Sequence, residues 1–151
     1  MIRSAFCLLV GVALFCLAGS SAFGDKSPAE RETRGALDGA WRLVASRSGD
    51  TGELVKAPKD CEHMKFIAGR RFLWTNVKDG KISSAAGGKC RLRNGRYTER
   101  VQHVLLESDK WLVGGRYSFE CTLEGDTWYH KGVMQRGTEV DTIYQVWKRV
   151  K

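Results

Sequence analysis

The sequence predicts an all-β domain, an eight-stranded antiparallel up-and-down barrel, on three observations. Short runs rich in β-branched and aromatic residues recur from residue 41 to residue 149. Turn signals separate these runs at intervals of about 8 to 12 residues, as in sandwiches and barrels. Helical periodicity is nearly absent from the same region. Eight strands close a barrel around side chains or one small ligand, and closure leaves no unpaired sheet edge.

Length and composition indicate one soluble domain. The chain has 151 residues, of which 42% are hydrophobic and 28% charged, which excludes collagen, a disordered tail and a multidomain enzyme. About 127 residues remain once an N-terminal signal is removed, enough for one hydrophobic core. They are too few for a paired dinucleotide-binding fold or an eightfold β/α barrel.

The first 24 residues are typical of a secretory signal peptide. Arg3 provides a positive charge, residues 6–18 an apolar stretch, and Ala22-Phe23-Gly24 a cleavage site with small residues. A membrane anchor is the less favoured alternative, because about 13 apolar residues are short of the roughly 20 that span a bilayer. We therefore expect cleavage near Gly24, a secreted or periplasmic protein, a polar leader over residues 25–36 and a barrel domain over residues 37–151.

Eight strands are expected in order along the chain. They are Trp41–Arg47, Glu62–Ile67, Arg71–Val77, Lys81–Cys90, Arg96–Val104, Arg116–Leu123, Thr127–Met134 and Val140–Arg149. One long irregular segment, Ser46–Asp60, connects the first two strands. It is either a flap over the barrel mouth or a solvated connector.

Two turns fix the register of the strands beside them. Both central residues of a type I′ turn need a positive φ, so Asn94-Gly95 predicts a two-residue hairpin turn. The Gly125-Asp126 turn places Glu120 opposite Lys131 on the outer face. Because side chains alternate along a strand, other residues of that hairpin then face the lumen: Tyr117, Phe119, Cys121 and His130.

The turn between the second and third strands carries a different signal. Ala68-Gly69-Arg70 suits a three-residue loop with a glycine bulge, which pairs Phe66 with Phe72 and turns Phe66 and Trp74 inward. Counting side chains from the turn before the fourth strand puts odd-numbered residues such as Ala85 inward. Counting from the turn after it puts the even-numbered Cys90 inward, so the two counts conflict. A bulge at Gly87-Gly88 reconciles them by inserting one residue.

A series of motifs carries a family resemblance. Gly39-Ala40-Trp41 opens the first strand and Trp147-Lys148-Arg149 ends the last, similar to the G-x-W of lipocalins and the arginine that packs on its tryptophan. The other motifs follow in order: Lys65-Phe66, Arg71-Phe72-Leu73-Trp74, Gly87-Gly88, Tyr97-Thr98-Glu99, Gly114-Gly115-Arg116-Tyr117, Glu124-Gly125-Asp126-Thr127-Trp128 and Trp147-Lys148-Arg149-Val150.

Over residues 37–150 the chain resembles the uncharacterised, secreted bacterial family of lipocalin-like domains, which are calycin-type barrels. The resemblance implies an eight-stranded barrel with an internal cavity, and it gives Trp41 and Arg149 structural roles. We expect Trp41 to close one end of the lumen. The family has no assigned ligand to carry over, and Lys89-Cys90 departs from the aromatic residue that relatives tend to show after the glycine pair.

Side chains of the predicted lumen are the candidate ligand-binding residues. They are Phe66, Phe72, Trp74, Tyr97, Glu99, His103, Tyr117, Phe119, Trp128 and His130. Ligand pockets are mostly apolar with a few convergent polar groups, which Glu99, His103 and His130 supply. A carboxylate in the lumen must be paired or solvated, so Glu99 is alternatively an internal partner of Tyr97 or of a barrel-closing arginine. The aromatic side chains alternatively fill the lumen as a packed core.

No enzyme activity, metal site or cofactor is expected. The three histidines fall on different strands, and His63 points outward if Phe66 points inward, so a zinc site lacks a ligand. A nucleophile pair of Cys121 and His130 is less favoured than a buried thiol beside a core histidine. The cysteines that remain after the signal lie on strands that are not neighbours, so no disulfide is expected among Cys61, Cys90 and Cys121. Cys61 is the exception to watch, because it lies at a loop end that could bend over the barrel mouth.

The net charge is strongly basic, +8 at pH 7. Strand alternation turns four arginines of one hairpin outward as a basic patch: Arg91, Arg93, Arg96 and Arg100. This patch fits an anionic polymer or is an ordinary solvated face. Secretion argues against a genomic partner, and the sequence carries no nucleic-acid-binding signature, so no nucleic acid is expected as a partner.

Two functional hypotheses follow from these observations. The first is a secreted, non-catalytic barrel that binds a small hydrophobic or amphipathic molecule in its lumen. The alternative is a structural or surface-interaction module whose filled barrel presents the basic hairpin to anionic polymers. A lumen below about 300 Å³ favours the alternative, because typical ligand pockets are larger. The identity of the ligand and the oligomeric state stay open.

Overall fold

The computed structural model describes residues 35–151. The expected signal peptide over residues 1–24 and the leader up to residue 34 lie outside the described residues. Within the described part the elements follow in this order: β1 (Gly39–Ser48), β2 (Val55–Lys56), β3 (Cys61–Ala68), β4 (Arg71–Lys78), β5 (Lys81–Arg93), β6 (Arg96–Val104), η1 (Glu107–Leu112), β7 (Arg116–Glu124), β8 (Thr127–Arg136) and β9 (Glu139–Arg149).

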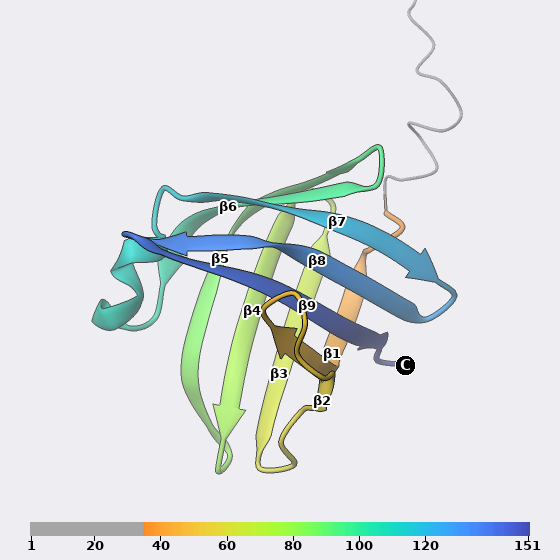
Figure 1. Ribbon diagram of the computed structural model, residues 1–151, viewed down its shortest axis with the longest axis horizontal. Coiled ribbons are helices and arrows are strands. Elements are labelled where there is room, and N and C mark those ends of the chain that lie inside the picture. The colour runs from red at the N-terminus through yellow and green to blue at the C-terminus, as the bar shows by residue number, and fades with distance from the viewer. Residues whose placement is uncertain (1–34) are drawn as a thin grey trace, which may run out of the picture.

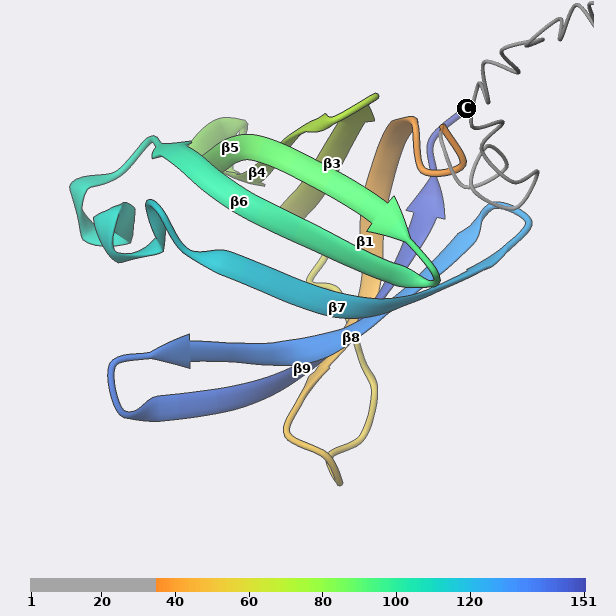
Figure 2. The same ribbon diagram turned by 90° about the horizontal axis from the view of Figure 1, so that it is seen from above.

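The strands form one antiparallel sheet that closes on itself. From β3 to β9 each strand pairs with the next, and β1 pairs with both β3 and β9. Eight strands, β1 and β3 to β9, therefore make the closed up-and-down barrel that the sequence predicts (Figures 1 and 2). All eight predicted strands are present, with ends within three residues of the expected ones.

Two elements are not predicted from the sequence. The strand β2 adds two residues beside β1 within the connector to β3, which is otherwise largely exposed, as a solvated connector is. The 3₁₀ helix η1 lies between β6 and β7 at the end of the barrel away from the C terminus (Figure 2). No helix among residues 35–151 is long and apolar enough to cross a membrane.

The β5–β6 hairpin has the predicted turn. Asn94 and Gly95 have φ angles of 50° and 69°, as a type I′ turn requires. Cys90 lies opposite Glu99 in the resulting ladder. Both side chains are buried, at 5% exposed each, so the turn directs this face of the hairpin into the lumen.

The β7–β8 hairpin also has the predicted register. Glu120 lies opposite Lys131, and both side chains are exposed. On the other face, Phe119 and His130 are 2% and 1% exposed. The predicted inward and outward faces of this hairpin are confirmed.

The β3–β4 hairpin differs from the prediction by one residue. Ala68 pairs with Arg71, so the turn has two residues, and Gly69 at its first central position has a φ of 57°. A glycine there is what a type II′ turn requires, and the expected three-residue loop is wrong. Since one residue of slippage inverts a strand, Phe66 lies on the outer face, 40% exposed, and Lys65 points inward, 3% exposed.

The predicted bulge is present, but the extra residue lies on the neighbouring strand. The β5–β6 register shifts between Gly87 and Gly88, and the unpaired residue is Gln102 on β6. A second shift, in the β4–β5 ladder, leaves Ser83 unpaired. A bulge re-aims the strand that follows it, so His103 is exposed on the outer face and not in the lumen.

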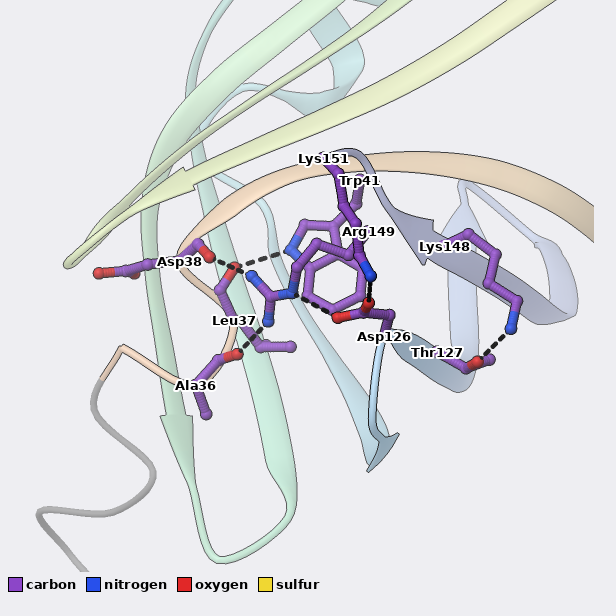
Figure 3. Close-up of polar contacts among 9 residues, drawn as sticks. All are labelled: Ala36, Leu37, Asp38, Trp41, Asp126, Thr127, Lys148, Arg149 and Lys151. Atoms are coloured by element: carbon purple, nitrogen blue, oxygen red, sulfur yellow. Dashed lines mark hydrogen bonds and ion pairs between the residues drawn. The ribbon is translucent and has the colours of Figure 1, made fainter.

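Trp41 packs at one end of the lumen, next to Leu37 and Arg149 (Figure 3). Its side chain is fully buried, and its indole N–H donates a hydrogen bond to the carbonyl of Leu37 at 2.8 Å. The guanidinium of Arg149 lies 4.2 Å from the centre of the Trp41 ring, a cation–π contact. Arg149 also donates hydrogen bonds to the carbonyls of Ala36 and Asp38. The expected structural roles of Trp41 and Arg149 agree with this packing.

Candidate functional site

A cavity of about 270 Å³ lies in the lumen at the end opposite Trp41. Every strand from β3 to β9 contributes to its wall, and η1 lies across its mouth. Its apolar lining is Trp74, Val101, Trp111, Leu112, Tyr117, Phe119, Met134, Ile143 and Trp147. Its polar lining is His63, Lys65, Ser84, Glu99, Asp109, His130 and Gln145. The lumen is therefore not completely filled by side chains.

A buried ion pair crosses the lumen beside this cavity. Lys65 on β3 donates a hydrogen bond from Nζ to Oε1 of Glu99 on β6 at 2.6 Å, and the two side chains are 4% and 6% exposed. The same Nζ lies 5.2 to 5.5 Å from the ring centres of Tyr97, Trp128 and Trp147. A buried carboxylate needs a partner, and Glu99 has Lys65 in that role.

His130 is buried among aromatic rings and lines the cavity. It stacks on Trp128 with ring centres 5.0 Å apart and an interplanar angle of 5°, and the Phe119 ring meets it edge-on at 3.9 Å. Burial, and then the charge of Lys65, hold the pKa of His130 well below 6.5. Among residues 35–151, neither ring nitrogen of His130 has a hydrogen-bond partner. A buried polar group without a partner is uncommon and calls for an explanation, such as a bound water, ion or ligand.

His63 lies on the inner face of β3, two residues before Lys65. Its ring meets those of Trp74 and Trp147 edge-on, with centres 5.7 and 5.1 Å apart. Burial, and then Lys65, lower the pKa of His63 to about 4. The outward position expected from the sequence is wrong, because it depended on the β3–β4 register. Within the described part of the chain, no three metal-ligating side chains gather into a site.

The helix η1 forms the mouth of the cavity. Leu112 is buried at 6% and packs on the core, whereas Trp111 is 39% exposed at the rim. The guanidinium of Arg136 lies 5.2 Å from the centre of the Trp111 ring. Oδ2 of Asp109 is buried and has no hydrogen-bond partner within residues 35–151. The mouth thus presents one apolar and one acidic side chain to a molecule entering the cavity.

The ten residues predicted to bind a ligand fall into three groups. Five line the cavity: Trp74, Glu99, Tyr117, Phe119 and His130. Three are buried in the barrel but do not line it: Phe72, Tyr97 and Trp128. Phe66 and His103 are on the outer face, where the two-residue β3–β4 turn and the Gln102 bulge place them.

Sequence reasoning missed several of the lining residues. Lys65 and His63 face inward only if the Gly69 turn has two residues, so a type II′ turn was the signal that identifies them. Alternation along β9, counted back from Trp147, identifies Ile143 and Gln145. A single short 3₁₀ helix has no period to detect, and η1 carried no comparable signal.

The geometry does not support a cysteine nucleophile. Cys121 lies opposite His130, but His130 accepts no hydrogen bond from it within the described residues. Burial raises the pKa of Cys121 to about 11, and that of Cys90 to about 11, so both thiols stay protonated near neutral pH. Cys61, Cys90 and Cys121 are all free of disulfides, as expected.

Comparisons with known proteins identify the fold. No family model and no curated protein matches the chain. A lipocalin-like protein from Bacteroides uniformis has a similar structure, with a TM-score of 0.54 and 15% sequence identity over 77% of this chain and 100% of that one. An uncharacterized protein from Bacteroides eggerthii has a TM-score of 0.53 and 14% identity over 75% of this chain and 98% of that one. The chain therefore forms a lipocalin-like β-barrel, as its motifs indicate.

Proposed function

We propose that this protein is a secreted, non-catalytic carrier or receptor that binds a small, uncharged, amphipathic molecule in the barrel lumen. The observation that carries the proposal is the cavity of about 270 Å³ beside His130, a buried side chain whose ring nitrogens have no partner within residues 35–151. A ligand hydroxyl, carbonyl or amide would supply that hydrogen bond. The aromatic wall would hold its apolar part.

The electrostatics of the cavity favour an uncharged ligand. The charges of Lys65 and Glu99 compensate each other at 2.6 Å. His63 and His130 are neutral near pH 7, because their pKa values are lowered. A net charge on the ligand would face no net opposite charge beside His130 and would lose its hydration. The one lining carboxylate without an ion pair among residues 35–151 is that of Asp109, at the mouth.

The volume of the cavity favours a small ligand. Typical pockets begin at about 300 Å³, so the cavity of 270 Å³ falls just below that limit, and its volume alone favours the filled barrel. Buried polar groups of a packed core are nearly all hydrogen-bonded, but within residues 35–151 Tyr97 and Trp128 also lack a partner and do not line the cavity. His130 differs from them because it lines the cavity, where a ligand can reach it. A compact ligand of up to three rings fits the volume better than a long acyl chain.

Non-catalytic action and secretion are part of the same proposal. The buried thiols Cys90 and Cys121 are held protonated by their raised pKa values, and the carboxylate of Glu99 is held by Lys65. In the free protein these two thiols and this carboxylate are therefore not available for nucleophilic or acid–base catalysis. The signal peptide expected over residues 1–24 supports export.

Titration with the neutral fluorophore N-phenyl-1-naphthylamine tests the proposal. Met134 lines the cavity, whereas its neighbour Val133 on β8 is 52% exposed. We expect saturable binding to the wild type, loss of binding in Met134→Trp, which fills the cavity, and unchanged binding in the matched control Val133→Trp. Native mass spectrometry of protein from its producing cell should then show a small copurified molecule. Equal binding by both variants would contradict a luminal site.

A further inference from the structure

A groove on the outer face of the barrel is lined by basic side chains. It runs over β4, β5, β6 and the start of β7 and has a volume of about 810 Å³. The four arginines of the predicted patch line it together with Lys89 on the same hairpin, and the fold adds three basic residues from elsewhere in the sequence: Arg70, Arg71 and Arg116. The groove is therefore wider and more highly charged than the β5–β6 hairpin alone.

Four of these residues form a continuous row across four adjacent strands. Arg71 pairs with Lys89, Lys89 with Arg100, and Arg100 with Arg116. All four side chains are exposed. Neighbouring strands are about 4.8 Å apart, so this basic row places four positive charges within roughly 15 Å. Like charges directly opposite each other destabilise a sheet, and folding therefore gives no reason for the row.

The charges of the basic row are not compensated locally. Among residues 35–151, no carboxylate forms an ion pair with any member of the row. Glu120 lies opposite Arg96 at the edge of the groove, and these two side chains form no ion pair either. A concave surface lined by one sign of charge concentrates the field and attracts a ligand of the opposite sign.

We infer that the basic row binds a linear, phosphate-bearing polyanion, for which inorganic polyphosphate is the simplest representative. Three of the four members are arginines, whose planar guanidinium forms bidentate hydrogen bonds with phosphate oxygens. The row has one positive charge on each of four neighbouring strands, which suits a linear ligand with a negative charge on every repeating unit. This site is on the opposite face of the sheet from the lumen, so it is independent of the proposed luminal ligand.

The other residues of the groove favour this ligand over nucleic acids and membranes. Apart from the basic side chains, the described residues that line it are Cys90, Asn94 and Thr98. Single-stranded nucleic acids are bound largely by stacking of bases on aromatic side chains, and none lines the groove within residues 35–151. Surface binding to membranes uses large apolar side chains, and none of those lines it either.

Fluorescence anisotropy with end-labelled polyphosphate tests the inference on the purified protein. The row variant replaces Arg71, Lys89, Arg100 and Arg116 with Gln. The control variant removes the same number of charges from exposed lysines elsewhere: Lys56, Lys59, Lys78 and Lys81. We expect the row variant to lose about tenfold or more in affinity and to show a shallower salt dependence, and the control to lose less than about twofold. Binding of N-phenyl-1-naphthylamine should stay unchanged in both.

Several results would overturn the inference. They are the absence of polyphosphate binding to the wild type, equal losses in the two variants, and oligothymidylate binding as tight as polyphosphate at equal phosphate concentration. Binding to vesicles with 30% phosphatidylglycerol in place of polyphosphate would assign the groove to a membrane instead. The row variant should melt at or above the wild-type temperature because repulsion is relieved. If it does not fold, the double variant Lys89→Gln/Arg100→Gln should still lose about threefold in affinity.

Discussion

The two ends of the lumen differ in how completely side chains fill them. At the closed end, the indole N–H of Trp41 donates to Leu37, and Arg149 covers the Trp41 ring at 4.2 Å. At the other end His130 is equally buried, yet its ring nitrogens have no partner within residues 35–151, and a cavity lies beside it. The comparison teaches that the closely packed end and the proposed ligand site are at different ends of one barrel.

The largest effect is expected at the closed end, for Trp41→Ala. Removal of a buried tryptophan costs about 3–5 kcal/mol, a large part of the 5–15 kcal/mol that stabilises a typical domain. We expect the upper part of that range, because the variant also loses the contact with Arg149 and the bond to Leu37. Urea unfolding followed by circular dichroism measures the loss. Trp111→Ala at the exposed mouth should lose no more than half as much, and an equal loss would break the contrast between the ends.

The ion pair between the two ends should give the next largest effect. Glu99→Gln removes the charge that pairs with Lys65 in the barrel interior. The variant leaves a buried ammonium without its counter-charge, which should cost about 3 kcal/mol, at the lower end of the range because Gln keeps the shape and a hydrogen-bond acceptor.

A double variant separates loss of the pair from loss of packing. Lys65→Met/Glu99→Gln removes both charges, and we expect it to be more stable than either single variant. Unfolding curves of the four proteins give the coupling free energy. Additive losses in the double variant would show that the two charges do not interact in the folded protein.

Acidification should destabilise the fold through His63 and His130, which line the cavity. The pKa of His63 is lowered to about 4 and that of His130 well below 6.5, so the unfolded chain binds more protons than the folded one below pH 6.5. This contribution to stability is complete above pH 6.5 and is lost as the pH falls toward 4, by up to about 1.4 kcal/mol per pH unit for each histidine. Urea unfolding at pH 7.5, 6 and 5 measures it. His130→Phe should flatten the slope, and an unchanged slope would contradict the assignment.

The smallest effect concerns the reactivity of the thiols. Burial raises the pKa values of Cys90 and Cys121 to about 11, whereas Cys61 lies half-buried at the start of β3. We expect iodoacetamide at pH 8 to alkylate Cys61 first in the native protein and all three residues in urea, as measured by peptide mass spectrometry. A disulfide between any two of them, or fastest labelling of Cys121, would be inconsistent with the fold.

The sequence predicts the register of a hairpin correctly wherever its turn residues fit only one turn length. Asn94-Gly95 requires two positive φ angles, and the glycine of Gly125-Asp126 likewise fits a two-residue turn, so both hairpins are correct. The segment Ala68-Gly69-Arg70 allows a two-residue or a three-residue turn, because a glycine suits either, and sequence alone does not choose. The consequence is large, since Lys65 and Phe66 exchange faces.

The candidate site is predicted less completely than the fold. Its aromatic wall follows from alternation in correctly registered strands, as for Phe119 and His130. Its charge balance does not, because Lys65 and Glu99 are 34 residues apart and lie on strands that do not pair. Bulges are similarly non-local: the glycine pair marks the place, but the partner strand supplies Gln102 as the extra residue.

The most direct test of a ligand at the unfilled end uses the indole N–H resonances of the five tryptophans. Trp74, Trp111 and Trp147 line the cavity, whereas Trp41 closes the other end. In ¹H–¹⁵N spectra recorded during titration with N-phenyl-1-naphthylamine, we predict large shifts for the three tryptophans of the cavity and almost none for Trp41. Shifts that are uniform along the barrel, or confined to Trp41, would contradict binding at the open end of the lumen.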